Sequence, residues 1–148
     1  MKKMIFTLAL SLLVAVGVNA QDAQNTKGDW YVGTGNIANV SWTNWSVAPT
    51  LGYGVTDNLM MGLDLSQADT DTDLSMGLHA RYFLSLAGES LFIYAASKDV
   101  LNLDTPSLNI GVGKFFTFHK GGMYVDPKIV FDLNEKTTNL QLGFGLKF

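Results

Sequence analysis

The chain of 148 residues contains no cysteine. Disulfides therefore contribute nothing to its stability, and no acylated cysteine can anchor it to a lipid bilayer. Basic residues are also few, since 10 lysines and arginines stand against 13 aspartates and glutamates. This acidic balance argues against a nucleic-acid partner.

Long apolar runs and helical periodicity are absent after residue 20. No later stretch approaches the ~20 apolar residues of a spanning helix, and no 3.6-residue repeat competes with the two-residue alternation found there. If the mature chain lies in a membrane, it must do so as a closed β-barrel. Only helices and closed barrels satisfy every backbone N–H and C=O group in lipid.

The first 20 residues have the pattern of a secretory signal peptide. Two lysines follow Met1, an apolar run extends over residues 4–18, and Ala20 is the small residue before a cleavage point. A membrane-anchor helix is the alternative, but the run is short for one and lacks a basic flank. We expect export through the inner membrane with a cleaved signal peptide over residues 1–20, a polar leader over 21–28 and a transmembrane barrel over 29–148.

The rest of the chain alternates between strand-like segments and polar turns. Strands are predicted over residues 29–37, 46–55, 59–66, 74–85, 91–98, 107–118, 123–132 and 139–148. The connections tend to alternate between long and short, as they do in bacterial outer-membrane barrels. The predicted fold class is all-β, an eight-stranded antiparallel up-and-down transmembrane β-barrel.

The last ten residues show the alternation most clearly. Leucine and phenylalanine occupy one face, whereas glycine and polar residues occupy the other. Five other predicted strands repeat this division, with Lys114 as the one exception on the apolar face; for residues 91–98 the faces cannot be assigned. A soluble barrel would turn the apolar face inward. Eight glycines on the other face suit the narrow interior of an eight-stranded barrel better.

Aromatic residues sort to the two ends of the predicted strands. Such girdles mark the headgroup regions of a membrane. The expected members are Trp30, Tyr53, Tyr82, Phe116, Phe118 and Phe148 at the inner rim and Trp42 and Trp45 at the outer rim.

The chain ends in a specific pattern formed by Gln141, Gly143, Leu146 and Phe148. In this respect it resembles the small eight-stranded outer-membrane barrels of the OmpA/OmpX type, which are porin-like proteins of the Gram-negative envelope. The resemblance implies that the last strand is read by the outer-membrane assembly machinery. Leu146 departs mildly from the aromatic residue that the family pattern favours.

The predicted lumen contains charged and polar side chains, which we interpret as a structural plug because isolated buried charges are costly. An ion or proton path is the alternative. Asp64 and Arg81 lie on neighbouring strands and are expected to be close. The expected members of the lumen network are Asp64, His79, Arg81, Asp126, Lys128, Asp132, Gln141 and Lys147.

No catalytic or metal site is predicted. A catalytic histidine needs a nucleophile beside it, but Ser75 and Ser85 on the strand of His79 are at least ~13 Å away along it. Ser66 lies on the next strand and could come close to His79 only if the strand register allows it. Residues 69–73 begin like a calcium loop but lack the glycine and glutamate that such a loop requires. No cofactor is expected.

Two prolines and one lysine fit the pattern poorly. Pro49 and Pro127 lie inside predicted strands, where each removes a hydrogen-bond donor, and we expect a β-bulge at each. Lys114 points toward lipid by strict alternation. It either extends toward the interface or marks a shift of register by one residue.

The sequence therefore predicts a non-enzymatic, monomeric outer-membrane protein at the cell surface with a narrow, side-chain-filled lumen. Its expected partners are outer-membrane lipid, lipopolysaccharide and the assembly machinery. One alternative is a soluble periplasmic barrel that binds a small apolar ligand. The other is a lipid-modifying enzyme.

Overall fold

The computed structural model describes residues 21–22, 25–37, 48–66, 75–84, 90–98, 100, 107–118 and 122–148. The predicted signal peptide, Trp42, Trp45, Ser85, His119 and the acidic loop at 69–73 lie outside these residues. Within them, no helix is long and apolar enough to cross a membrane.

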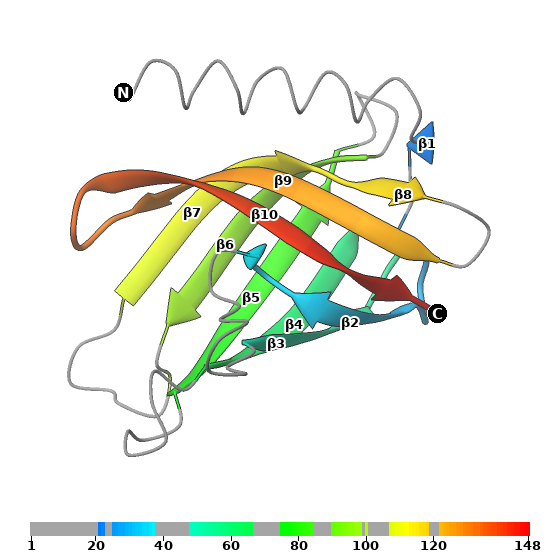
Figure 1. The fold of residues 1–148 in the computed structure, drawn as a ribbon, viewed down its shortest axis with the longest axis horizontal. Coiled ribbons are helices and arrows are strands. Elements are labelled where there is room, and N and C mark those ends of the chain that lie inside the picture. Colours follow the sequence, from blue (N-terminus) through cyan, green and yellow to red (C-terminus); the bar gives the residue numbers. More distant parts are fainter. Residues whose placement is uncertain are drawn as a thin grey trace.

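The chain forms a closed antiparallel barrel (Figure 1). Its strands are β1 (Gln21–Asp22), β2 (Trp30–Thr34), β3 (Pro49–Gly54), β4 (Leu59–Ser66), β5 (Ser75–Phe83), β6 (Leu91–Lys98), β7 (Ser107–Lys114), β8 (Phe116–Phe118), β9 (Met123–Asp132) and β10 (Thr137–Lys147). Neighbours in the chain pair with each other from β2 to β7. β7 and β8 share one place beside β9, and β10 pairs with β2 to close the ring. The prediction of an all-β, eight-stranded antiparallel up-and-down barrel is confirmed.

The closing seam joins the last strand to the first full strand. Gly145 lies opposite Gly33, and Phe144 lies opposite Thr34. A side chain at Gly33 would overlap the carbonyl of Phe144 and the Cα of Gly145. The two strands approach so closely at this point that only glycine fits.

The two ends of the barrel differ, and we name them by their residues. The terminus end holds Trp30 and Phe148, whose backbones exchange hydrogen bonds of 3.1 and 2.9 Å. The far end holds Thr34 and Lys98, the last residues of β2 and β6.

The predicted leader is attached to the terminus end of the barrel. β1 pairs with β8, with Asp22 opposite Phe116. The side chain of Asn25 is buried, donates to the carbonyl of Thr56 at 2.6 Å and accepts from the Tyr31 hydroxyl at 2.7 Å.

Neither predicted bulge is present in the described parts of the strands. Pro49 is the first residue of β3, where a missing donor is tolerated. At Pro127 the pairing of β9 with β10 is unbroken. The interruption falls on the other side of β9, where Phe115 separates β7 from β8 without changing their common register on β9. Proline has no N–H to donate, so the predicted sixth strand is split instead of bulged.

The same constant register decides between the two readings of Lys114. No shift by one residue occurs, because β7 and β8 keep the same alignment on β9. Lys114 therefore stays on the outer side of the alternation. Its ammonium lies 5.1 Å from the centre of the Phe116 ring, a cation–π distance.

The connection between β9 and β10 is a four-residue turn and not a loop over residues 133–138. The Asp132 carboxylate accepts the backbone N–H groups of Asn134 and Glu135 at 3.0 and 3.1 Å. Lys136 completes the turn with a φ of 54°. As a result β10 begins at Thr137, two residues earlier than predicted.

The outside of the barrel is apolar at most strand positions, with Lys114 and Ser97 among the exceptions. Residues that point outward alternate with buried ones, as in the burial pattern of β6. Exposed apolar and aromatic side chains include Trp30, Val32, Leu51, Tyr53, Met61, Leu63, Leu78, Tyr82, Ile93, Ile110, Val112, Met123, Ile129, Leu140, Phe144, Leu146 and Phe148. The structure also resolves the undecided strand: β6 turns Phe92, Tyr94 and Ala96 inward and Ile93 and Ala95 outward.

Candidate functional site: the lumen

An aromatic layer fills the lumen toward the terminus end. Phe115 packs against Tyr124 and Tyr31, with ring centroids 4.8 and 5.6 Å apart. Phe83 lies 5.7 Å from Phe92. All five rings are at most 1% exposed. Within the described residues, this layer obstructs a passage along the barrel axis.

An ion cluster lies next to the aromatic layer. Arg81 Nη2 is 2.6 Å from Asp126 Oδ2, and Lys128 Nζ is 3.5 Å from the same oxygen. All three side chains are at most 1% exposed. Because β5 and β9 are not neighbours in the sheet, the Arg81–Asp126 pair spans the lumen. The expected proximity of Asp64 and Arg81 does not produce an ion pair between them.

The wall makes room for this cluster at Gly143. A Cβ at Gly143 would overlap the Asp126 carboxylate. Gly62 makes room for His79 in the same way, because a Cβ at Gly62 would overlap the imidazole ring. Glycine on the inner face therefore accommodates large polar side chains in a narrow barrel.

A second cluster is centred on Asp64. Its two carboxylate oxygens contact Thr50 Oγ1 at 2.6 Å and His79 Nδ1 at 2.9 Å. The other ring nitrogen, His79 Nε2, is buried without a hydrogen-bond partner among the described residues. A general base needs that nitrogen within reach of a nucleophile. The barrel wall at Gly62 lies where a nucleophile would have to be, beside His79 Nε2. The Asp64–His79 pair therefore lacks the geometry of a catalytic dyad.

We predict that Thr50→Val destabilises the barrel by about 2 kcal/mol, because a hydrogen bond to a half-buried carboxylate is lost while the side-chain shape is kept. Thr34→Val is the matched control, since its hydroxyl bonds a neutral carbonyl, that of Asn36, at 3.2 Å. Urea titrations of both variants in micelles measure the difference. Equal losses in the free energy of unfolding would mean that the hydrogen bond to Asp64 contributes no more than the one to the Asn36 carbonyl.

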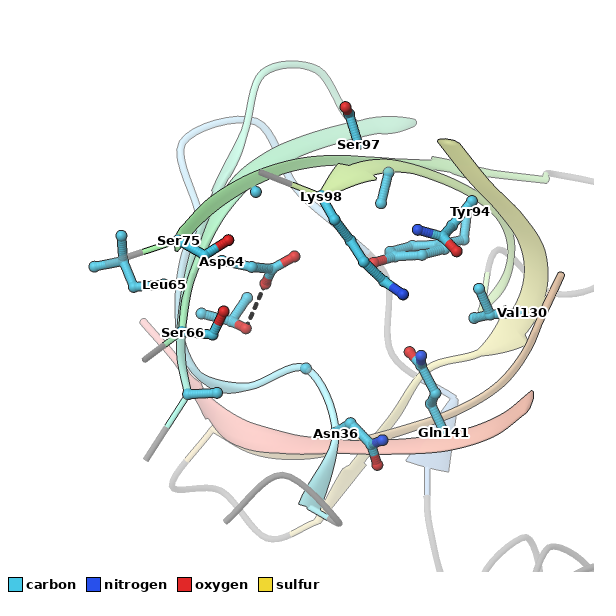
Figure 2. Close-up of a pocket in the computed structure, with 16 residues that line it drawn as sticks. Asn36, Asp64, Leu65, Ser66, Ser75, Tyr94, Ser97, Lys98, Val130 and Gln141 are labelled. Atoms are coloured by element: carbon cyan, nitrogen blue, oxygen red, sulfur yellow. Dashed lines mark hydrogen bonds between the residues drawn. The ribbon is translucent and has the colours of Figure 1, made fainter. Parts of the chain in front are cut away.

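The far half of the lumen contains a cavity of about 170 Å³ (Figure 2). Figure 2 shows Asp64, Lys98, Tyr94 and Gln141 pointing into it, whereas Leu65 points away. At its rim, Lys98 Nζ lies 3.2 Å from Asp132 Oδ2. Charged and polar side chains therefore share the lining with apolar ones such as Ala96 and Val130.

Most of the predicted network residues lie in the lumen. Ion pairs described above hold Arg81, Asp126, Lys128 and Asp132. Asp64 and His79 contact each other, and Gln141 lines the cavity. Lys147 is different, because it lies at the terminus end and pairs with Asp29 at 2.9 Å.

The predicted girdle residues have mixed environments. At the terminus end Trp30, Tyr53 and Tyr82 are exposed, and the first two rings lie 4.9 Å apart. Phe148 is also exposed, whereas Phe116 is buried. Among the C-terminal pattern residues, Gly143 faces the lumen and Leu146 faces outward.

The sequence prediction missed the aromatic layer and the cavity. Tyr31, Phe83, Phe115 and Tyr124 do alternate with outward residues, so period two already placed them inside. The presence of several aromatic residues among the inward positions was the signal that part of the lumen is apolar. Tyr94 was missed because the faces of its strand show no contrast.

The described residues contain no cluster of three or more histidine, cysteine or acidic side chains that would hold a metal ion. Comparison with protein-family models, with characterised proteins and with solved structures gave no match.

Proposed function

We propose that the chain is an integral outer-membrane β-barrel of the small eight-stranded type, with a filled lumen and a structural or surface role instead of a catalytic one. The supporting observation is that apolar side chains occupy most of the outward strand positions. Val112 is 53% and Ile93 48% exposed in the isolated chain. Soluble proteins rarely leave so continuous an apolar surface in water, and lipid is the partner that suits it on all sides of a barrel.

The inner face supports the same proposal. Ion pairs and hydrogen bonds neutralise its charges inside the wall, where a soluble ligand-binding barrel would place apolar side chains. Two charged side chains in the cavity lining, those of Asp64 and Lys98, do not suit a purely apolar ligand. A soluble periplasmic carrier therefore has less support than a membrane barrel.

The ends of the outer face agree with a membrane rim. Trp30, Tyr53 and Tyr82 are exposed close to the chain terminus, as expected for aromatic residues at a headgroup boundary. The C-terminal pattern supports the outer-membrane assembly machinery as a proposed partner. We also propose that the barrel is a monomer.

Membrane fractionation of cells that express the full chain tests the proposal. We expect the protein in the outer-membrane fraction, resistant to carbonate and salt washes and released only by detergent. Its gel mobility should change when the sample is boiled, since a folded barrel stays folded in detergent until it is heated. Recovery in the aqueous fraction without detergent would contradict the proposal.

We also predict that the purified protein shows no large, steady conductance in planar bilayers, because the aromatic layer fills the lumen. A wide-pore barrel reconstituted in parallel is the positive control. A stable open level in most insertions would show that the aromatic layer does not seal the lumen.

A further inference from the structure

We infer that the far half of the lumen is a binding cup for a small, uncharged, hydroxyl-rich molecule of monosaccharide size. This inference concerns the lumen and does not depend on what covers the outer face. It starts from the cavity of about 170 Å³. That volume is well above the ~10–15 Å³ that one water needs and below the ~300 Å³ at which drug-sized sites begin.

The charges around the cup balance. Asp64 and Lys98 line the cup. The other charged groups lie beside it in the ion pairs already described, and they are Asp126, Asp132, Arg81 and Lys128. Each of these three carboxylates and three cations is in an ion pair or a hydrogen bond. The formal charges of these six groups sum to zero. A ligand that brings a net charge would leave that charge without a counterion in a partly buried site, which is costly.

The hydrogen-bonding groups of the cup are not balanced in this way. Tyr94, Asn109 and Gln141 line the cavity, and Tyr94 and Asn109 are 8% and 3% exposed. The structure gives these three side chains no hydrogen-bond partner among the described residues. Buried polar groups nearly always have partners, so these groups are available to water or to a ligand.

The chemistry of these groups selects the ligand class. Two carboxamides each offer a donor and an acceptor, and a tyrosine hydroxyl does the same. Ser66 and Ser75 add hydroxyls at the rim. Hydroxyl groups on a ligand are likewise both donors and acceptors, so a polyol or sugar matches the whole set, whereas a carboxylate would use only the donors.

Titration of the refolded full chain with D-glucose tests the inference. The protein is held in micelles of a detergent without a sugar headgroup, or in buffer if it proves soluble. The side-chain amide signals of Asn109 and Gln141 are followed by NMR. We expect saturable shifts with a Kd on the order of millimolar, as suits so small a ligand. Acetate and 1-propanol should give none.

Two neighbouring alanines supply a matched pair of variants. Ala96 lines the cup and Ala95 points outward on the same strand. Ala96→Leu should weaken glucose binding at least tenfold, whereas Ala95→Leu should leave it unchanged. Gln141→Leu removes one carboxamide and should weaken binding about fivefold to tenfold, which keeps the test available if Ala96→Leu does not fold.

Three results would overturn the inference. The first is the absence of any saturable shift with glucose. The second is tighter binding of acetate than of glucose, which would make the cup an anion site. The third is an equal effect of Ala95→Leu and Ala96→Leu, which would place binding outside the cup.

Discussion

Asp126→Asn is expected to destabilise the barrel by about 3–5 kcal/mol, the usual cost of removing one partner from a buried ion pair. Arg81 and Lys128 would then remain as two cations without a carboxylate, each at most 1% exposed. The amide keeps the shape of the carboxyl group, so the loss reports charge and not volume. Urea titration of the refolded variant in micelles measures it.

Lys98→Met is the matched control for this prediction. Lys98 also pairs with an aspartate, Asp132, but its side chain is 59% exposed at the rim. Asp132 is itself buried, but it keeps the backbone N–H groups of Asn134 and Glu135 as donors when Lys98 is replaced. The exposed ammonium contributes little because solvent screens it, so the control should lose only about 1 kcal/mol. If Asp126→Asn costs no more than this control, the buried cluster is not a stabilising plug.

The second large effect is expected at the closing seam. Gly33→Ala places a methyl group against the carbonyl of Phe144 and the Cα of Gly145. Backbone atoms cannot move aside as a flexible side chain can, so β2 and β10 must separate. We expect a loss of about 3 kcal/mol, at the upper end for overpacking, with a reduced yield of the heat-modifiable form on gels.

Gly35→Ala is the control for the seam. The nearest atom to a Cβ at Gly35 is Thr50 Oγ1 at 3.2 Å, which belongs to a side chain. This variant should lose less than about 1 kcal/mol, because a contact at that distance needs only a small adjustment. Similar yields of folded barrel for both variants would show that the close approach at Gly33 does not limit closure.

The alternation of side chains was sufficient to predict the strands and most of their faces. It works because period two is a local property of an extended backbone. It failed for β6, where Phe92, Tyr94 and Ala96 face in while Ile93 and Ala95 face out. Both faces are apolar, so the sequence gives no contrast to read.

The pairing of charges was beyond the sequence for a different reason. Arg81 meets Asp126 across the lumen, and this contact depends on how far each strand is staggered around the ring. The stagger is a property of the whole barrel. The split at Phe115 is similar, because it results from the absence of an N–H at Pro127 on another strand.

Single-cysteine spin labelling tests most directly whether the outer face meets lipid, and the absence of native cysteine makes it straightforward. Labels replace Ile110 and Ile129, which point outward, and Asn109 and Val130, which point inward. In reconstituted vesicles we expect the two outward labels to collide with oxygen dissolved in lipid and to be shielded from an aqueous nickel chelate, unlike the inward pair. Outward labels that are accessible to the chelate would contradict a lipid-facing barrel.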